Sequence, residues 1–350
     1  MSQGKLTAAL WFAVVPTVLA ACVEVPEDAD DLDVGTEAQA KGGCPLWGCG
    51  ENSPVINTWD FHELNAYGVA NTAGVKLHGL WKGGIEYQPR VTGAVLEGFP
   101  KSGVGPVLQG AALAGSYFDV QTPYGVHYQI LITKVSNNVG YWIAPDSPNE
   151  TYELLYTKSD TPSAARPLCK NPPGEHDPEG HLWTNAYEAF LFTGDRYSTR
   201  NFTVTTDERV TEGWFSIGCA GSALAKLHLN RHTAAGSTPS YQSTQAQRQA
   251  MLKMYVADVC ETGFASTKQG EPLRWENQPG WDTLPGVISS YEAIWGPQGA
   301  ICLDTHRLEG TQFWIDFDME NQIAAHCPGN QLPPPCNLVP GVISWPPGSY

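Results

Sequence analysis

Apolar and polar residues alternate over much of the first half of the chain, which predicts strands with one buried side. The clearest run places every second residue on one face: Val126, Tyr128, Ile130 and Ile132. Another strand is predicted from Val75 onward, directly after the turn-forming residues 71–74. Residues 44–200 are therefore predicted to form a β-rich module.

The period of the pattern changes after residue 220, where two helices are predicted. The longer one begins at Thr244, which has capping-box spacing to Gln247. Its apolar residues recur at helical intervals until Gly263 ends it: Met251, Leu252, Tyr255, Val256 and Val259. A shorter helix is predicted to begin at Ser222.

Turns are frequent, because the chain has 36 glycines and 27 prolines among 350 residues. Residues 264–268 and 271–275 flank a Gln–Gly pair, and this pattern predicts a hairpin. Together these patterns predict a mainly β fold with a few short helices (α+β).

The charge balance excludes one class of partner. The net charge is −16, with 20 basic residues against 36 acidic ones. A nucleic-acid-binding protein needs a concentrated basic face to neutralise phosphates. We therefore expect no nucleic-acid partner.

The first 22 residues have the layout of a bacterial export signal. Lys5 provides the positive charge, and residues 6–19 form an apolar run too short to span a bilayer as a stable helix. The run ends in Leu-Ala-Ala-Cys, which resembles a lipobox, where the cysteine is acylated and becomes the mature N-terminus. Cys22 is therefore the predicted lipidation site; the alternative is an ordinary signal peptide that is cut near Ala21.

Lipid on Cys22 implies attachment to a membrane through several acyl chains. Val23 stands where an Asp would favour retention in the inner membrane, so the predicted location is the cell envelope, at the outer membrane. The acidic residues 23–43 hold few apolar side chains and are predicted to form a disordered tether.

Eight cysteines remain after Cys22, and this even number predicts disulfides formed in an oxidising compartment. They are Cys44, Cys49, Cys169, Cys219, Cys260, Cys302, Cys327 and Cys336. Spacing favours two local bridges, Cys44–Cys49 and Cys327–Cys336, and leaves the other four cysteines unassigned. No Cys-x-x-Cys pair is present, so no zinc site is predicted.

Residues 254–260, Met-Tyr-Val-Ala-Asp-Val-Cys, resemble the signature of the bacterial ADYC domain family. Residues 267–272 and 291–302 resemble the hairpin and the closing strand that follow the signature, so the resemblance covers residues 201–310. It departs at Val259, where the motif has Tyr. The resemblance implies an exported bacterial protein, often a lipoprotein, with no established activity.

The motif residues themselves, Ala257, Asp258, Val259 and Cys260, favour a structural role over catalysis. They stand at a helix end, which would deliver Cys260 to a disulfide. The Asp258 carboxylate is expected to accept hydrogen bonds from the following turn. The C-terminal residues 311–350 are predicted to form a Pro-rich tail behind the ADYC-like domain.

Three carboxylates in the tail offer possible chemistry: Asp316, Asp318 and Glu320 alternate with Phe317 and Met319. On a strand they would share one face and provide oxygens for Ca²⁺ or a glycosidase acid and base. The simpler interpretation is an amphipathic strand with its acidic side in water. A Ca²⁺ cofactor therefore stays a minor alternative to no cofactor.

Two histidine groups suggest metal sites, and both have simpler explanations. His228 and His232 are four residues apart, as zinc-binding histidines on a helix are, but the intervening glutamate is missing. A Pro- and Gly-rich loop holds a second set: His176, Asp177, Glu179 and His181. We interpret the first pair as surface histidines at a helix end and the second set as an exposed turn.

No nucleophile is apparent, because the chain has no Gly-x-Ser-x-Gly elbow and disulfide sulfurs are not thiolates. The sequence favours an envelope lipoprotein with a non-catalytic binding or structural role and an unknown protein or glycan partner. The alternatives are a secreted hydrolase of envelope polymers or glycans that uses carboxylates such as Asp316 and Asp318, and a Ca²⁺-stabilised adhesion module.

Overall fold

The computed structural model describes the following residues: 54–56, 59–139, 149–160, 165–169, 188–234, 243–267, 273–277, 292–336 and 342–345. The predicted export signal, the tether and the Cys44–Cys49 bridge lie outside them. Within these ranges no helix has the length and apolar character to cross a membrane.

An antiparallel sheet of 11 described strands is the largest element. Its order is β3-β15-β12-β10-β9-β8-β4-β5-β6-β7, and β11 pairs with β10. The strands in chain order are β3 (Glu63–Asn65), β4 (Lys76–Lys82), β5 (Ile85–Thr92), β6 (Val95–Pro100), β7 (Leu108–Gln109), β8 (Tyr117–Gln121), β9 (His127–Val139), β10 (Asn149–Lys158), β11 (Arg166–Pro167), β12 (Glu188–Phe192) and β15 (Trp214–Cys219). The sheet thus includes strands from both sides of residue 201, where the sequence resemblance to the ADYC domain begins.

The predicted alternation is confirmed in β9. Tyr128, Ile130 and Ile132 are buried on one side of the sheet, and Val126 packs against the same core. The strand predicted after residue 75 is β4, and the turn before it closes with a hydrogen bond from Gly74 N to Asn71 O. One face of the sheet therefore covers a hydrophobic core, and on the opposite face the side chains of the central strands, such as Tyr117, Asp119 and Gln129, are only partly buried.

Both predicted helices are present, as α4 (Ala223–Leu229) and α5 (Gln245–Val256). Ser222 caps α4, and Thr244 forms the predicted capping box with Gln247. Helix α5 ends at Val256 and not at Gly263, because Ala257 adopts the left-handed conformation with φ of 53°. Hydrogen bonds from Ala257 N to Met254 O and from Asp258 N to Lys253 O close the helix end as a Schellman motif.

Strand β12 joins the two main cores. Ala189 and Leu191 face the sheet core, whereas Phe190 and Phe192 pack with α4 and α5. Gly218 in the neighbouring strand β15 lets α4 approach closely, because an added Cβ would lie 3.0 Å from Ala225 N.

A second antiparallel sheet has the order β16-β19-β17-β18. Its strands are β16 (Arg274–Asn277), β17 (Ala293–Gly296), β18 (Gly299–Leu303) and β19 (Val342–Trp345). The hairpin predicted over residues 264–275 is wrong: β16 pairs with β19, and Phe264 and Ala265 lie in a loop packed into the helical core. The residues that resembled a closing strand form the β17–β18 hairpin.

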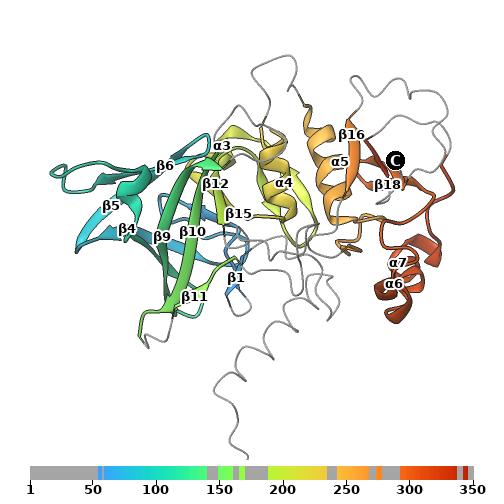
Figure 1. Ribbon diagram of the computed structural model, residues 1–350, viewed down its shortest axis with the longest axis horizontal. Helices are drawn as coiled ribbons and strands as arrows, with labels where there is room; N and C mark the ends of the chain where they lie inside the picture. Colours follow the sequence, from blue (N-terminus) through green and yellow to red (C-terminus); the bar gives the residue numbers. More distant parts are fainter. Residues whose placement is uncertain are drawn as a thin grey trace, which may run out of the picture.

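The remaining elements are short and lie around these sheets. They are β1 (Val55–Ile56), β2 (Trp59–Asp60), η1 (Gly110–Leu113), β13 (Arg196–Ser198), β14 (Thr203–Thr205), α3 (Glu208–Thr211), α6 (Gln312–Asp316), α7 (Met319–His326) and η3 (Pro328–Asn330). Figure 1 shows an elongated molecule with the large sheet at one end, α4 and α5 in the middle, and the second sheet with α6 and α7 at the other end. The predicted mainly β fold with a few short helices is confirmed.

Three disulfides connect distant parts of the described chain: Cys169–Cys219, Cys260–Cys327 and Cys302–Cys336. The predicted local bridge Cys327–Cys336 is therefore wrong. Helix α7 delivers Cys327 to the loop after α5, where Cys260 lies. Cys336 follows a Pro-rich segment whose Pro334 O accepts a hydrogen bond from Leu303 N, which brings that segment alongside β18 and Cys302.

Candidate functional site

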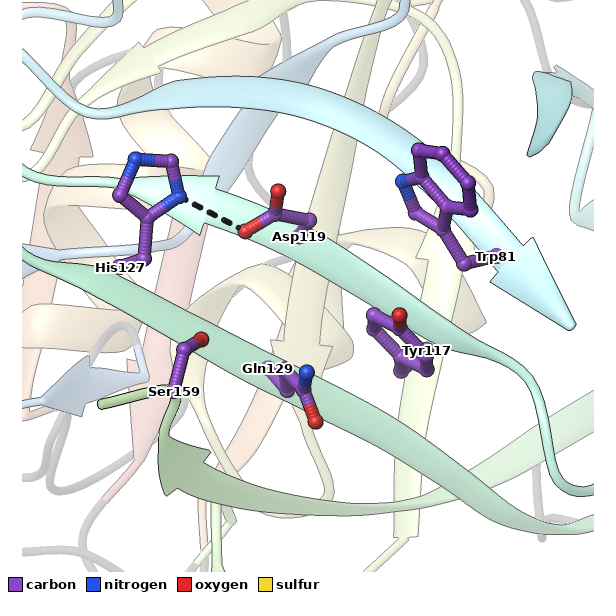
Figure 2. Close-up of a pocket in the computed structure, with 6 residues that line it drawn as sticks. All are labelled: Trp81, Tyr117, Asp119, His127, Gln129 and Ser159. Carbon is purple, nitrogen blue, oxygen red and sulfur yellow. Dashed lines mark hydrogen bonds and ion pairs between the residues drawn. The ribbon is translucent and has the colours of Figure 1, made fainter. Parts of the chain in front are cut away.

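The outer face of the large sheet carries a hollow of about 250 Å³. We call it the sheet-face hollow and define it by its lining residues: Trp81, Tyr117, Asp119, His127, Gln129 and Ser159. Five of these six are on or next to the central strands β4, β8 and β9, and Ser159 follows β10 directly. Figure 2 shows their side chains around the hollow.

The register of four neighbouring strands places the middle of the hollow. Gly79 of β4 lies opposite Asp119 of β8, which lies opposite Gln129 of β9, which lies opposite Thr157 of β10. Directly opposed residues of an antiparallel pair share one face of the sheet. The carboxylate of Asp119 and the amide of Gln129 are therefore neighbours, and the side chains of Trp81 and Glu86 occupy the room that Gly79 leaves in the same row.

An apolar row, with two aromatic rings, borders this middle row on one side. Trp81 is the register partner of Tyr117, and Tyr117 is the partner of Leu131. All three side chains are partly buried. A bulge between Leu77 and Gly79 inserts one residue into β4, and this shift puts Trp81 on the outer face while Leu77 stays in the core.

A polar network borders the middle row on the other side. The His127 Nδ1 atom lies 3.0 Å from Asp119 Oδ1, the bond drawn in Figure 2. The Gln121 amide nitrogen lies 2.9 Å from His127 Nε2, and its oxygen lies 3.1 Å from His78 Nε2. These contacts fit one donor order, with His127 Nδ1–H donating to Asp119 and His127 Nε2 accepting from Gln121. The network fixes the orientation of the carboxylate.

The histidine–carboxylate pair does not extend to a nucleophile within the described residues. The His127 nitrogen that would act as a base is occupied by Gln121. The Ser159 hydroxyl lines the hollow but is sealed from solvent and has no hydrogen-bond partner in the described chain. A serine hydrolase needs that hydroxyl within hydrogen-bond reach of the imidazole, and the described residues do not show this contact.

The ADYC-like motif is a structural junction, as its sequence indicated. Asp258 is fully buried, and its carboxylate pairs with Lys253 at 2.5 Å. It also accepts hydrogen bonds from Thr262 N and Gly263 N, which confirms the expected contacts to the following turn. Cys260 enters a disulfide. The four residues therefore connect α5, a loop and α7.

The motif also holds the β17–β18 hairpin. Val259 O accepts a hydrogen bond from Ala300 N at 2.8 Å. An added Cβ at Gly299, whose φ is 115°, would lie 2.7 Å from that same oxygen, so only glycine fits there. Asp258 is thus committed to packing and hydrogen bonding within the described chain.

The prediction that Asp316, Asp318 and Glu320 share one face of a strand is wrong. Asp316 ends α6, Asp318 precedes α7 with a left-handed φ of 48°, and Glu320 lies in the first turn of α7. Thr311 caps α6, and helical spacing brings Phe313 against Phe317, so the helix overrides the alternation. All three carboxylates are exposed to solvent. No group of potential metal ligands occurs among the described residues.

The two histidines are not the surface pair that was predicted, because His228 is partly buried and His232 is buried. His228 stacks on the Phe192 ring at 4.6 Å, and His232 is buried beyond the end of α4. Burial lowers the pKa of each histidine to about 4, so both are neutral. The second set, His176, Asp177, Glu179 and His181, lies outside the described residues.

Sequence reasoning missed the sheet-face hollow. The alternation that identified the buried side of β9 also places His127 and Gln129 on its other side, and Tyr117 and Asp119 alternate in the same way. That signal was present in the sequence. The bulge in β4 and the strand order that bring Trp81 beside them are long-range properties of the fold.

The comparisons with known proteins identify a family. A model of the ADYC domain matches residues 110–309, a longer stretch than the residues 201–310 that carried the resemblance. No curated protein and no solved structure matches the chain. The matched region includes β8 to β10, both helical core elements and the motif junction, and it covers more than half of the sequence. The chain belongs to the ADYC domain family.

Proposed function

We propose that this chain is an exported lipoprotein of the cell envelope, anchored through Cys22, with a non-catalytic binding role at the sheet-face hollow. The three disulfides are the main observation that supports the proposal. All six described cysteines are paired, and the partners are 34 to 67 residues apart. Such bridges persist in oxidising compartments and are rare in the cytosol. The export-signal layout of residues 1–22 agrees with this compartment.

The binding role is supported by the chemistry of the hollow. It combines two aromatic rings with a carboxylate, an amide and an imidazole on a rigid sheet, which is a common composition of ligand sites. Within the described residues, no nucleophile–base pair accompanies it. We therefore assign the protein a ligand and no reaction.

Metabolic labelling tests the anchor. The full-length chain is expressed in a bacterial host fed with an alkynyl fatty acid, beside the variant Cys22→Ala. We expect label and membrane association for the wild type and neither for the variant. An unlabelled wild type that appears in the soluble fraction would contradict the proposal.

A second assay tests the absence of catalysis. Asp316 and Asp318, the residues of the hydrolase alternative, are exposed and hydrogen-bonded to Gln312 and Asn321 of their own helices. We expect no new reducing ends when the protein is incubated with envelope polysaccharide, and no difference between wild type and the double variant Asp316→Asn, Asp318→Asn. Release by the wild type alone would favour the hydrolase.

A further inference from the structure

We infer that the sheet-face hollow binds one ring of an uncharged saccharide, with Trp81 as the stacking platform. The inference deepens the binding role proposed above and rests on it. It follows from the position of the Trp81 indole, from the hydrogen-bond donors and acceptors around it, and from the charge of the site.

The indole of Trp81 packs against its own strand, β4, because Gly79 has no side chain to displace it. A Cβ added at Gly79 would come within 3.1 Å of Trp81 Nε1. Residues 79 and 81 share the outer face of β4, so the N–H edge of the indole lies beside the glycine, and the ring lines the hollow as a flat aromatic plate. Flat aromatic faces pack well against a sugar ring, because the C–H groups on one side of the ring form an apolar surface.

The polar side chains beside the plate offer both donors and acceptors. Asp119 supplies acceptor oxygens, Gln129 supplies an amide of both kinds, and Trp81 supplies an N–H donor. No hydrogen bond within the described residues occupies the Gln129 amide or the indole N–H. Sugar hydroxyl groups both donate and accept hydrogen bonds, so they can pair with the carboxylate, the amide and the indole N–H. An ammonium ion would use the carboxylate and the rings but could not accept from the donors.

Charge selects against acidic ligands. Asp119 is the one carboxylate in the lining of the hollow, and the chain carries a net charge of −16. Lys101 forms an ion pair with Glu86, and Lys76 lies opposite Gln121, one row away from Asp119. A phosphorylated or uronic sugar bound beside Asp119 would meet the negative charge of its carboxylate, whereas a neutral ring would not.

The hollow is also held in position before any ligand arrives. The hydrogen bonds from His78 through Gln121 and His127 to Asp119 fix the carboxylate. All four residues are on β4, β8 or β9, which are paired in the middle of the sheet. Preorganisation of this kind reduces the entropy lost on binding.

A glycan array and titration calorimetry test the inference on the full-length protein extracted in detergent. The array carries neutral and acidic oligosaccharides, and the best neutral ligand is then titrated into each variant. We expect Trp81→Ala and Gly79→Val to weaken binding by about tenfold or more, because one removes the plate and the other displaces it. Trp81→Phe should retain part of the affinity. The control Tyr124→Ala removes an aromatic ring that is 82 % exposed outside the hollow, and it should change affinity by less than about twofold.

The outcomes separate this inference from the proposed function. Binding of neutral saccharides that depends on Trp81 and Gly79 supports it. A preference for acidic saccharides overturns it, as does equal binding by wild type and both hollow variants, or tighter binding of tetramethylammonium than of any sugar. If no saccharide binds while Cys22 is still acylated, the ligand class is wrong and the anchored lipoprotein remains.

Discussion

Several buried charged side chains of the described residues lie in ion pairs, and two of these pairs join separate elements of the fold. Arg307 contacts both carboxylate oxygens of Glu292 and also donates to Met254 O at the end of α5. Arg248 of α5 pairs with Asp195 after β12. Removing one member of such a pair leaves an uncompensated charge, which is strongly destabilising. These residues fix the arrangement of the elements.

His62 is a buried histidine that should make stability depend on pH. Burial alone would lower its pKa, but Asp60 and Glu63 outweigh burial and raise the pKa to about 9. The unfolded chain releases this proton near pH 6.5. The stabilisation is therefore complete below about pH 6.5 and is lost as the pH rises through about 9, by up to about 3 kcal/mol.

Denaturant unfolding of the full chain between pH 6 and pH 10 measures this effect. We expect the free energy of unfolding of the wild type to fall over this range relative to that of His62→Gln, which has no proton to lose. Parallel curves for the two proteins would show that His62 is not charged in the folded state.

Helix α5 illustrates which elements the sequence could predict. Its start depends on Thr244 and Gln247, three residues apart, and such local contacts can be recognised in a sequence. Its end at Ala257 was missed because Ala rarely adopts a left-handed conformation. The conformation is held there by distant contacts, such as the hydrogen bonds from Ser266 to Ala257 O.

The junction after α5 should be sensitive to loss of Asp258. In Asp258→Ala, the buried ammonium of Lys253 loses its partner, and Thr262 N and Gly263 N lose their acceptor. We expect a loss of about 3–5 kcal/mol in the free energy of unfolding. The control Asp160→Ala removes an exposed partner of Lys158 and should cost less than about 1 kcal/mol. Chemical denaturation of both variants measures the difference, and equal small losses would show that Lys253 does not need its partner.

At the scale of the whole molecule, the disulfides show where sequence reasoning ends. The even count of cysteines after Cys22 predicted bridges, but the short spacing of Cys327 and Cys336 suggested the wrong one. Spacing favours local closure, whereas the fold brings Cys260 and Cys302 to these residues from 67 and 34 positions away. In the same way, alternation gave the faces of β9 but not the strand order that assembles the sheet-face hollow.

The long bridges should contribute strongly to stability, since each closes a loop of tens of residues, with an expected gain of about 4 kcal/mol each in the chain-entropy model. Their formation, together with acylation of Cys22, is the central claim of this account. Peptide mapping of the protein isolated from bacterial membranes, alkylated before digestion and without reduction, tests both at once. We predict the bridges Cys169–Cys219, Cys260–Cys327 and Cys302–Cys336, no alkylated cysteine, and an N-terminal peptide that begins at acylated Cys22. Alkylated cysteines among these six, or an uncut leader ahead of an unmodified Cys22, would contradict it.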